Sequence, residues 1–451
     1  MINKYISKVA IVLIALVMWQ CEPKVDSFTP SSGSADFSSF VAIGDSYTAG
    51  YTDGALGQRG QMESFAYILA KQLESVGSKG FNQPMVKSRG SVGSTVIDES
   101  GSLNGYYELS TASGSLAPVP TMGDMAILAE RVYDASNPFH NVGIPGAKVI
   151  HMRYPGYGMA NPFFTRFASN PVSTTVIDDA MLAKPTFACL WIGNNDVLGY
   201  ALAGGESDAI TPHTLFQSEM EEVVDKIFAE ANGVIGNIPA IDAIPFFNTV
   251  TYDALVLDQA TADMLNAHPN YIAYNQGSEA LGLDKIIFQA GSNALVIADE
   301  DYAHPGKIRQ IKKGEKVLLS ASGKISDKEI GWGYMQPIPA THVLDEFELE
   351  DIRDETMEYN SAIATICDNE DIALVDLSAI MDELSTTGLI IDGNKYTDTF
   401  VTGGVFSLDG IHATGRGSAI IANAFIEAIN KQYGAMVPLA NINDYAGVKF
   451  P

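Results

Sequence analysis

A serine that follows a short apolar run near the start of the chain could act as a nucleophile. The run Phe40 to Gly44 leads into Asp45 and Ser46, within the stretch FVAIGDSY. A serine hydroxyl is a weak nucleophile, so it needs a base within hydrogen-bond reach and a carboxylate that orients this base. Because Gly, Asp and Ser are also common turn formers, the motif alone is more typical of an ordinary turn. Its chemistry therefore depends on partners elsewhere in the chain.

Of the seven histidines, His412 has the most suitable neighbours for a base. It lies in FSLDGIHATG, where Asp409 precedes it by three residues. This spacing lets one tight loop carry both the imidazole and its orienting carboxylate, with Gly410 relieving the backbone between them. The pattern Asp-x-x-His is common by itself. For the other six histidines no carboxylate is expected in an orienting position, and surface or structural roles are favoured: His140, His151, His213, His268, His304 and His342.

Acyl transfer also requires hydrogen-bond donors for the oxyanion of the tetrahedral intermediate. Two motifs offer candidates, Gly146 in NVGIPGAK and Asn195 in WIGNNDV. Gly146 has no side chain to block the approach of its amide, and Asn195 carries a side-chain amide. A turn glycine and a turn or helix-cap asparagine are the ordinary interpretations of these residues. Neither motif is sufficient without the serine and the histidine.

The elements that must position these residues follow from the hydrophobic pattern. Short apolar runs between turn residues alternate with helical patterns, which predicts a parallel sheet with helices on both faces. Loops at the carboxyl ends of such strands share one crevice, so side chains distant in sequence can meet there. Strands are expected at 40–44, 140–144, 186–193, 233–238 and 372–377, and helices at 62–75, 215–231, 346–368 and 414–430, the last with Thr414 as its N-cap.

Four motifs, AIGDSY, NVGIPGA, WIGNND and DGIH, in this order, resemble the sequence blocks of the SGNH (GDSL-type) serine hydrolase superfamily. The resemblance implies an α/β fold, a three-layer α/β/α sandwich with a flavodoxin-like parallel sheet. It implies that Ser46 is the catalytic nucleophile, His412 the base and Asp409 the partner of this base. The oxyanion hole would consist of the Ser46 and Gly146 amides and the Asn195 side chain. No cofactor and no metal are implied.

The sequence between the motifs departs from a minimal member of this superfamily. The hydrolase domain is expected at 39–435, with insertions at about 77–120 and 248–340. The first insertion is rich in Gly and Ser and predicts an irregular excursion over the surface. The second predicts a helical stretch followed by a small β-rich part, which could serve as a lid or partner surface. A Gly-x-Ser-x-Gly elbow, which an α/β-hydrolase requires, does not occur around Ser46, where Tyr47 and Thr48 follow.

The resemblance predicts a lipase or acylhydrolase that cleaves carboxylic esters, and two alternatives stay open. Superfamily members include carbohydrate deacetylases, so a carbohydrate O-acetyl esterase is one alternative. The other is a noncatalytic surface lipoprotein that binds glycan or lipid in the same crevice. The expected ligand is thus a small-molecule, lipid or glycan ester. Nucleic acid is not expected as a partner, because 27 basic against 54 acidic residues give a net charge of −27, which repels phosphate backbones.

The beginning of the chain predicts export. Lys4 and Lys8 precede a short apolar run, so residues 1–20 are typical of a lipoprotein-type signal peptide that ends before Cys21. Lipid attached to Cys21 would anchor the protein to the bacterial outer membrane or cell surface. The preceding MWQ lacks the usual small residue, so a periplasmic or secreted protein without lipid is the alternative. Residues 21–38 predict a flexible tether, and 436–451 a C-terminal tail.

Overall fold

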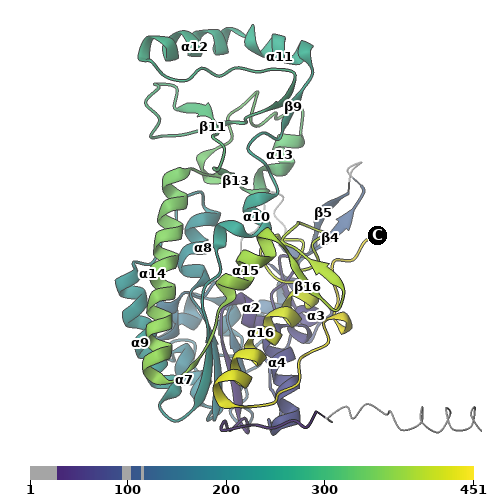
Figure 1. Ribbon diagram of the computed structural model, residues 1–451, viewed down its shortest axis with the longest axis vertical. Coiled ribbons are helices and arrows are strands. Elements are labelled where there is room, and N and C mark those ends of the chain that lie inside the picture. Colours follow the sequence, from purple (N-terminus) through teal and green to yellow (C-terminus); the bar gives the residue numbers. More distant parts are fainter. Residues whose placement is uncertain (1–27, 94–102, 113–115) are drawn as a thin grey trace, which may run out of the picture.

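A five-stranded parallel sheet forms the centre of the computed structural model, which describes residues 28–93, 103–112 and 116–451 (Figure 1). The order of the strands is β15-β8-β7-β1-β6, which is 2-1-3-4-5 when they are numbered along the chain. This is the doubly wound order found in flavodoxin. The five expected strands are therefore confirmed: β1 Phe40–Gly44, β6 Asn141–Gly143, β7 Phe187–Trp191, β8 Asn232–Gly236 and β15 Ala373–Val375.

Helices cover both faces of the sheet. On one face α4 (Phe65–Leu73) packs against α16 (Gly415–Tyr433), and on the other α9 (His213–Phe228) packs against α14 (Glu346–Glu370) and α7 (Val176–Met181). The four expected helices are thus present. Thr414 is the N-cap of α16, because its side chain accepts a hydrogen bond from the Gly417 amide at 3.1 Å.

The remaining elements between these helices and strands are short. They are α2 Ser46–Ala49, β2 Leu56–Gly57, α3 Gln58–Met62, β3 Ser91–Val92, α5 Ala126–Ala129, α6 Pro162–Thr165, α8 Asn194–Leu202, α15 Leu377–Thr386, β16 Leu389–Ile391 and β17 Asn394–Tyr396.

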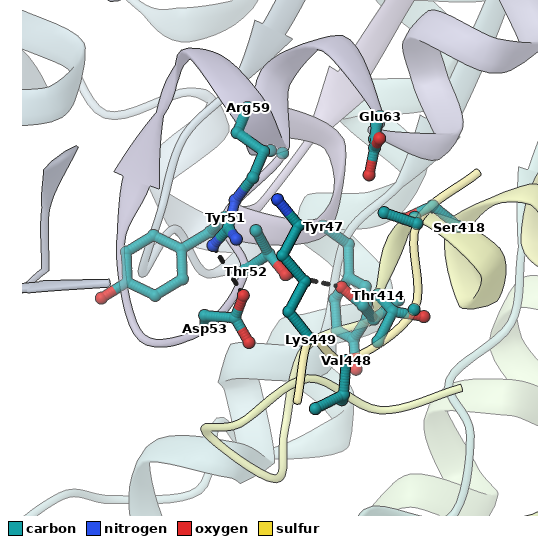
Figure 2. Close-up of a pocket in the computed structure, with 16 residues that line it drawn as sticks. Tyr47, Tyr51, Thr52, Asp53, Arg59, Glu63, Thr414, Ser418, Val448 and Lys449 are labelled. Atoms are coloured by element: carbon teal, nitrogen blue, oxygen red, sulfur yellow. Dashed lines mark hydrogen bonds and ion pairs between the residues drawn. The ribbon is translucent and has the colours of Figure 1, made fainter. Parts of the chain in front are cut away.

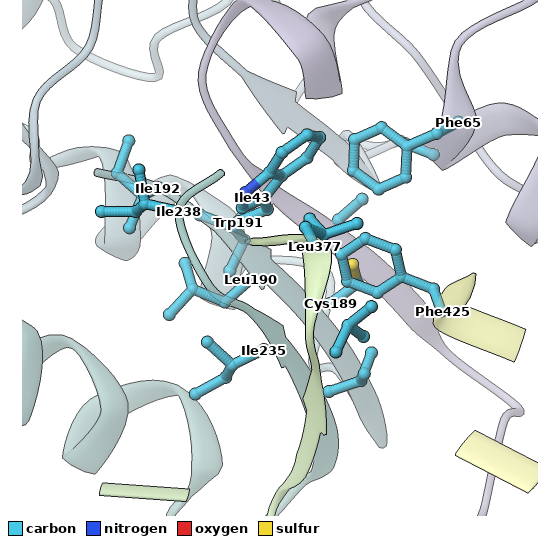
Figure 3. Close-up of a cluster of buried hydrophobic side chains, with 14 of the residues drawn as sticks. Ile43, Phe65, Cys189, Leu190, Trp191, Ile192, Ile235, Ile238, Leu377 and Phe425 are labelled. Atoms are coloured by element: carbon cyan, nitrogen blue, oxygen red, sulfur yellow. The ribbon is translucent and has the colours of Figure 1, made fainter. Parts of the chain in front are cut away.

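Aromatic side chains fill the core between the sheet and the α4–α16 face. Figure 3 shows Trp191 of the central strand β7 beside Phe65 of α4 and Phe425 of α16. The ring centroids of Phe65 and Trp191 lie 5.3 Å apart, and those of Phe65 and Phe425 lie 5.1 Å apart. Burial of such large rings removes much apolar surface from water and dominates the stability of a core. Cys189, on β7, contributes a buried free thiol to the same cluster.

The second insertion has its own hydrophobic core and stands on the end of the sheet that carries α8 and α10 (Figure 1). Its short strands pair as antiparallel couples, β9 with β10, β11 with β12 and β13 with β14. Its elements are α10 Pro245–Asn248, β9 Leu255–Leu257, α11 Gln259–Asn266, α12 Pro269–Leu281, β10 Gly291–Asn293, β11 Val296–Ala298, β12 Ile308–Gln310, β13 Lys316–Val317, α13 Ser322–Ser326 and β14 Val343–Leu344.

The first insertion contains a β-hairpin where the sequence predicted only an irregular excursion. Strand β4 (Asn104–Ser110) pairs with β5 (Ala117–Met122), and Pro118 and Pro120 lie within β5. Proline cannot donate to a ladder, so the two prolines argue against a strand in the sequence. They are tolerated because, among the described residues, the hairpin has only two strands and one edge of β5 pairs with no other strand.

The prediction of a flexible tether at 21–38 is wrong for the second half of this segment. Ser31 forms a bridge with Met436, and the side chain of Phe37 is 1% exposed and packs on Phe187 with ring centroids 4.7 Å apart. One buried aromatic ring therefore ties a Ser- and Pro-rich segment to the sheet. The expected C-terminal tail also belongs to the globule, since Val437 is buried.

The predicted signal peptide and Cys21 lie outside the described residues. Within the described part of the chain, none of the helices combines the length and the apolar character that a membrane span requires.

Candidate active site

The register of the sheet brings three of the predicted motifs to one edge. Gly44, the last residue of β1, pairs with Gly143 of β6 on one side and with Trp191 of β7 on the other. Because these strands are parallel, the loops that follow them leave the sheet side by side, at the point where the strand order reverses. These loops carry Ser46, Gly146 and Asn195. All three residues, with Asp409 and His412, line one cavity of about 920 Å³.

Ser46, His412 and Asp409 form a continuous hydrogen-bonded chain. The Oγ of Ser46 lies 2.8 Å from Nε2 of His412, and Nδ1 of His412 lies 2.9 Å from Oδ2 of Asp409. Ser46 is 7% exposed and His412 8% exposed. The hydroxyl, the imidazole and the carboxylate thus stand in the order that a serine nucleophile requires.

The Asp409 carboxylate is buried and surrounded by donors. It accepts hydrogen bonds from the amides of Gly54 at 2.7 Å and of Ile411 and His412 at 2.8 Å, and from the Ser407 hydroxyl at 3.0 Å. Burial alone would raise the pKa of Asp409, but the adjacent His412 and the donated hydrogen bonds hold this pKa well below its usual range. The carboxylate is therefore ionised, and it fixes the proton of His412 on Nδ1, leaving Nε2 free to accept.

A loop from the start of the chain fastens the loop that carries His412. Asp53 accepts from the Leu408 amide at 2.8 Å and pairs with Arg59 at 2.7 Å, while the Thr52 hydroxyl donates to the Ala413 carbonyl at 2.9 Å. Figure 2 shows the Asp53–Arg59 pair in a small pocket whose walls include Tyr47 and Tyr51. Two segments from opposite ends of the chain are thus joined directly behind the candidate active site.

The imidazole of His412 is held between two tyrosine rings. The ring centroids of Tyr47 and Tyr51 lie 5.3 Å and 4.7 Å from that of His412. Each tyrosine hydroxyl donates to a backbone carbonyl at 2.6 Å, Tyr47 to Ile411 and Tyr51 to Gly54. Burial raises the pKa of both tyrosines, so they remain neutral. Their packing restricts rotation of the imidazole away from Ser46.

The motif Asn194-Asn195-Asp196 links the three strand-end loops. Asn194 donates to Oδ2 of Asp45 at 2.9 Å in the loop after β1. Asn195 donates to the Ala147 carbonyl at 3.0 Å, and the Asp196 carboxylate accepts from the Val149 amide at 2.9 Å, both in the loop after β6. Sequence reasoning singled out only Asn195. Its two neighbours are positioning residues that a short polar motif after a strand could have indicated.

The candidate oxyanion donors line the cavity, and the backbone conformation of Gly146 is a second reason for a glycine at this position. A Cβ at Gly146 would meet no atom within 4 Å, whereas its φ of +78° is a conformation that other residues rarely adopt. Among the described residues, the amides of Ser46 and Gly146 donate to no acceptor. Asn195 uses one N–H on Ala147, so its second N–H is left for an oxyanion.

Two other described histidines, His213 and His342, have polar side-chain partners that the sequence did not predict. His213 lies 3.2 Å from the Glu355 carboxylate, so the expectation that it has no such partner is wrong. The pair lies on the surface, and no serine of the described residues bonds to it. His342 lies 2.8 Å from the hydroxyl of Ser320 at the edge of the cavity, and its ring packs on Trp332. No carboxylate in the described part of the chain orients His342, so this pair lacks the third group of a nucleophilic site.

Within the described residues, His, Cys, Asp and Glu form no cluster that could hold a metal ion. The cavity offers a serine, a histidine, a carboxylate and backbone amides, which are groups suited to covalent acyl transfer.

Comparison with known proteins adds little to this geometry. No protein-family model and no curated protein matches the chain. A solved structure described as "LAE5, an alpha/beta hydrolase enzyme from the metagenome of Lake Arreo, Spain" is 13% identical and covers 88% of this chain and 96% of its own, with a TM-score of 0.35. Both the identity and the TM-score are too low for this likeness to indicate what the chain does.

The raised pKa of Asp45, the N-cap of α2, leads us to expect that the stability of the protein depends on pH. Its carboxylate is buried and accepts from Tyr47 and Asn194, and burial raises its pKa from 3.8 to about 6. Between these two values the folded state holds a proton that the unfolded state has lost, so this contribution to stability falls as pH rises through the window. Asp45→Asn removes the titration. Its Oδ1 can still accept from Tyr47, and its amide can donate to Oδ1 of Asn194, which has no partner in the described structure, once the Asn194 side-chain amide turns over.

We therefore expect the free energy of unfolding of Asp45→Asn, relative to the wild type, to increase from pH 4 to pH 7. Urea denaturation at four pH values measures this difference. A difference that does not change with pH, or that decreases, would contradict the assignment.

Proposed function

We propose that the protein is a serine ester hydrolase of the SGNH (GDSL) type, which cleaves carboxylic esters through an acyl-enzyme. The hydrogen-bonded chain from Ser46 through His412 to Asp409 carries this proposal. The doubly wound strand order and the position of Gly146 and Asn195 in the same cavity agree with it.

In the first half of the reaction, the Ser46 Oγ attacks the ester carbonyl carbon while Nε2 of His412 takes its proton. The carbonyl oxygen becomes an oxyanion, which the amides of Ser46 and Gly146 and the side chain of Asn195 stabilise. The ionised Asp409 stabilises the imidazolium. The bond from carbon to the alcohol oxygen then breaks, and the imidazolium gives its proton to the departing alcohol, which leaves the acyl group on Ser46.

In the second half, water enters the position of the alcohol. Nε2 of His412 takes a proton from this water as its oxygen attacks the acyl carbon, and the same donors bind the second oxyanion. The bond to Oγ breaks, Ser46 regains its proton from the imidazolium, and the carboxylic acid is released. Hydrolysis thus requires only groups that the cavity contains.

The nucleophile is tested by comparing two serines of the same cavity. Ser46→Ala should lower turnover of p-nitrophenyl esters by at least 10³-fold, because it removes the attacking oxygen. Ser320→Ala removes a hydroxyl that is also bonded to a histidine, His342, and should retain most of the activity. Retained activity in Ser46→Ala would refute the proposal. A wild-type protein that binds glycan or lipid but turns over no ester would support the noncatalytic alternative.

The oxyanion hole is tested by comparing two asparagines that line the cavity. Asn195→Ala should lower kcat by about 10²–10³-fold with little change in KM, because a donor to the oxyanion acts mainly in the transition state. Asn104→Ala, on the β-hairpin, should have less than a threefold effect on kcat. Equal effects of the two variants on kcat would argue against the assigned role of Asn195.

We also propose that the protein is exported and anchored through lipid on Cys21, as its first residues predict. In cells fed an alkyne-labelled fatty acid, the wild type should carry the label and sediment with membranes, and Cys21→Ser should carry none and become soluble. An unlabelled wild-type protein in the soluble fraction would instead indicate secretion without an anchor.

A further inference from the structure

One face of α8 forms an apolar path that leads away from the candidate oxyanion hole. Asn195, Leu198 and Leu202 are spaced by three and four residues, so they lie on the same side of the helix, and all three line the cavity. Asn195 and Leu202 are separated by seven residues, which is about 10 Å along a helix axis. An acyl chain attached to a carbonyl at Ser46 can therefore extend along two leucines.

Other apolar side chains of the same cavity come from the second insertion and its base. Phe246, in α10, donates its amide to the Gly410 carbonyl at 2.9 Å, between Asp409 and His412 in sequence. A Cβ at Gly410 would lie 3.1 Å from Leu319 and 3.2 Å from the Phe246 amide nitrogen. The insertion is thus seated on the loop that carries His412. Phe246 and Leu319 both line the cavity with the leucines of α8.

A strained loop adds two further apolar side chains. Phe400 and Val401 line the cavity, and Val401 has a φ of +66°. This conformation is rare for a β-branched residue and is energetically unfavourable. Such strain persists where the surrounding structure imposes it, often at a binding site. The loop is thus held in an unfavourable conformation that presents apolar groups to the cavity.

The cavity offers little to a charged ligand. Apart from tyrosines, Asp409 and His412 are the only acidic or basic residues among the described residues that line the cavity. Both are already bonded to each other. A phosphate or carboxylate buried along the α8 path would lose its hydration without gaining a cationic partner, which is costly. The net charge of −27 also disfavours the approach of anions.

We propose that the path between α8 and the insertion binds the acyl chain of uncharged esters, and that it selects medium-length aliphatic chains over acetyl groups. This inference rests on the proposed ester hydrolysis at Ser46 and names its substrate class. Apolar contacts to this chain come from Leu198, Leu202, Phe246 and Leu319. The insertion is then a part of the binding site and not only an appended unit.

The test is a series of p-nitrophenyl esters from acetate to octanoate, with the leaving group held constant. The wild type should show a kcat/KM for octanoate at least tenfold above that for acetate. Leu202→Trp should lower this octanoate-to-acetate ratio at least tenfold by filling the end of the path. Ala117→Trp, on the hairpin side of the same cavity, should leave the ratio within twofold. A monoester of octanedioic acid, whose chain ends in a carboxylate, should be cleaved at least tenfold less efficiently than octanoate.

Leu319→Ala gives a second measure if the tryptophan variant does not fold, and it should lower the octanoate ratio several-fold by removing apolar contacts with the chain. Two outcomes would overturn the inference and leave the proposed function intact. In the first, the wild type cleaves esters in a Ser46-dependent manner but prefers acetate. In the second, neither Leu202→Trp nor Leu319→Ala changes the octanoate-to-acetate ratio. Absence of any Ser46-dependent turnover would instead refute the proposed function, and the inference with it.

Discussion

The hydrogen bonds that the buried Asp409 carboxylate accepts are the interactions on which the rest of the site depends. An ionised carboxylate is costly inside a protein unless donors surround it, and here the donors come from both ends of the chain. The Gly54 amide lies 355 positions from Asp409 in sequence, and Ser407, Ile411 and His412 supply the remainder. Only the complete fold assembles this set. The geometry of the imidazole follows from it, because the carboxylate and the two tyrosine rings leave His412 one orientation, toward Ser46.

The sheet supplies the other half of the site. The parallel register between β1, β6 and β7 brings Ser46, Gly146 and Asn195 to one edge of the sheet, although their motifs are far apart in the sequence. The links made by Asn194, Asn195 and Asp196 then fix the spacing of the loops. The insertion contributes in a third way, since its contact with Gly410 joins one part of the cavity lining to the loop that carries His412. The same loops therefore position the Ser46–His412–Asp409 chain and form part of the cavity lining.

The motifs and strands could be predicted from sequence because their signals are local: a short apolar run, a turn residue and a reactive group. The partners of Asp409 could not, because Gly54 and Asp53 have no local pattern that marks them as neighbours of a distant loop. Phe37 shows the same limit, since a single buried ring outweighs a flexible composition. The hairpin could not be predicted because its two prolines argue against a strand. They are tolerated at a strand edge that pairs with no other described strand. Which side chains wall the cavity depends on how the insertion docks, and sequence periodicity does not encode that contact.

The central claim is that His412 activates Ser46 for attack. It is tested most directly by reacting the protein with a fluorophosphonate, which modifies an activated serine, and locating the adduct by peptide mass spectrometry. The account predicts a single adduct on Ser46, formed at least 10²-fold more slowly in His412→Ala. No adduct on Ser46, or an adduct that forms at an unchanged rate without the imidazole, would contradict it.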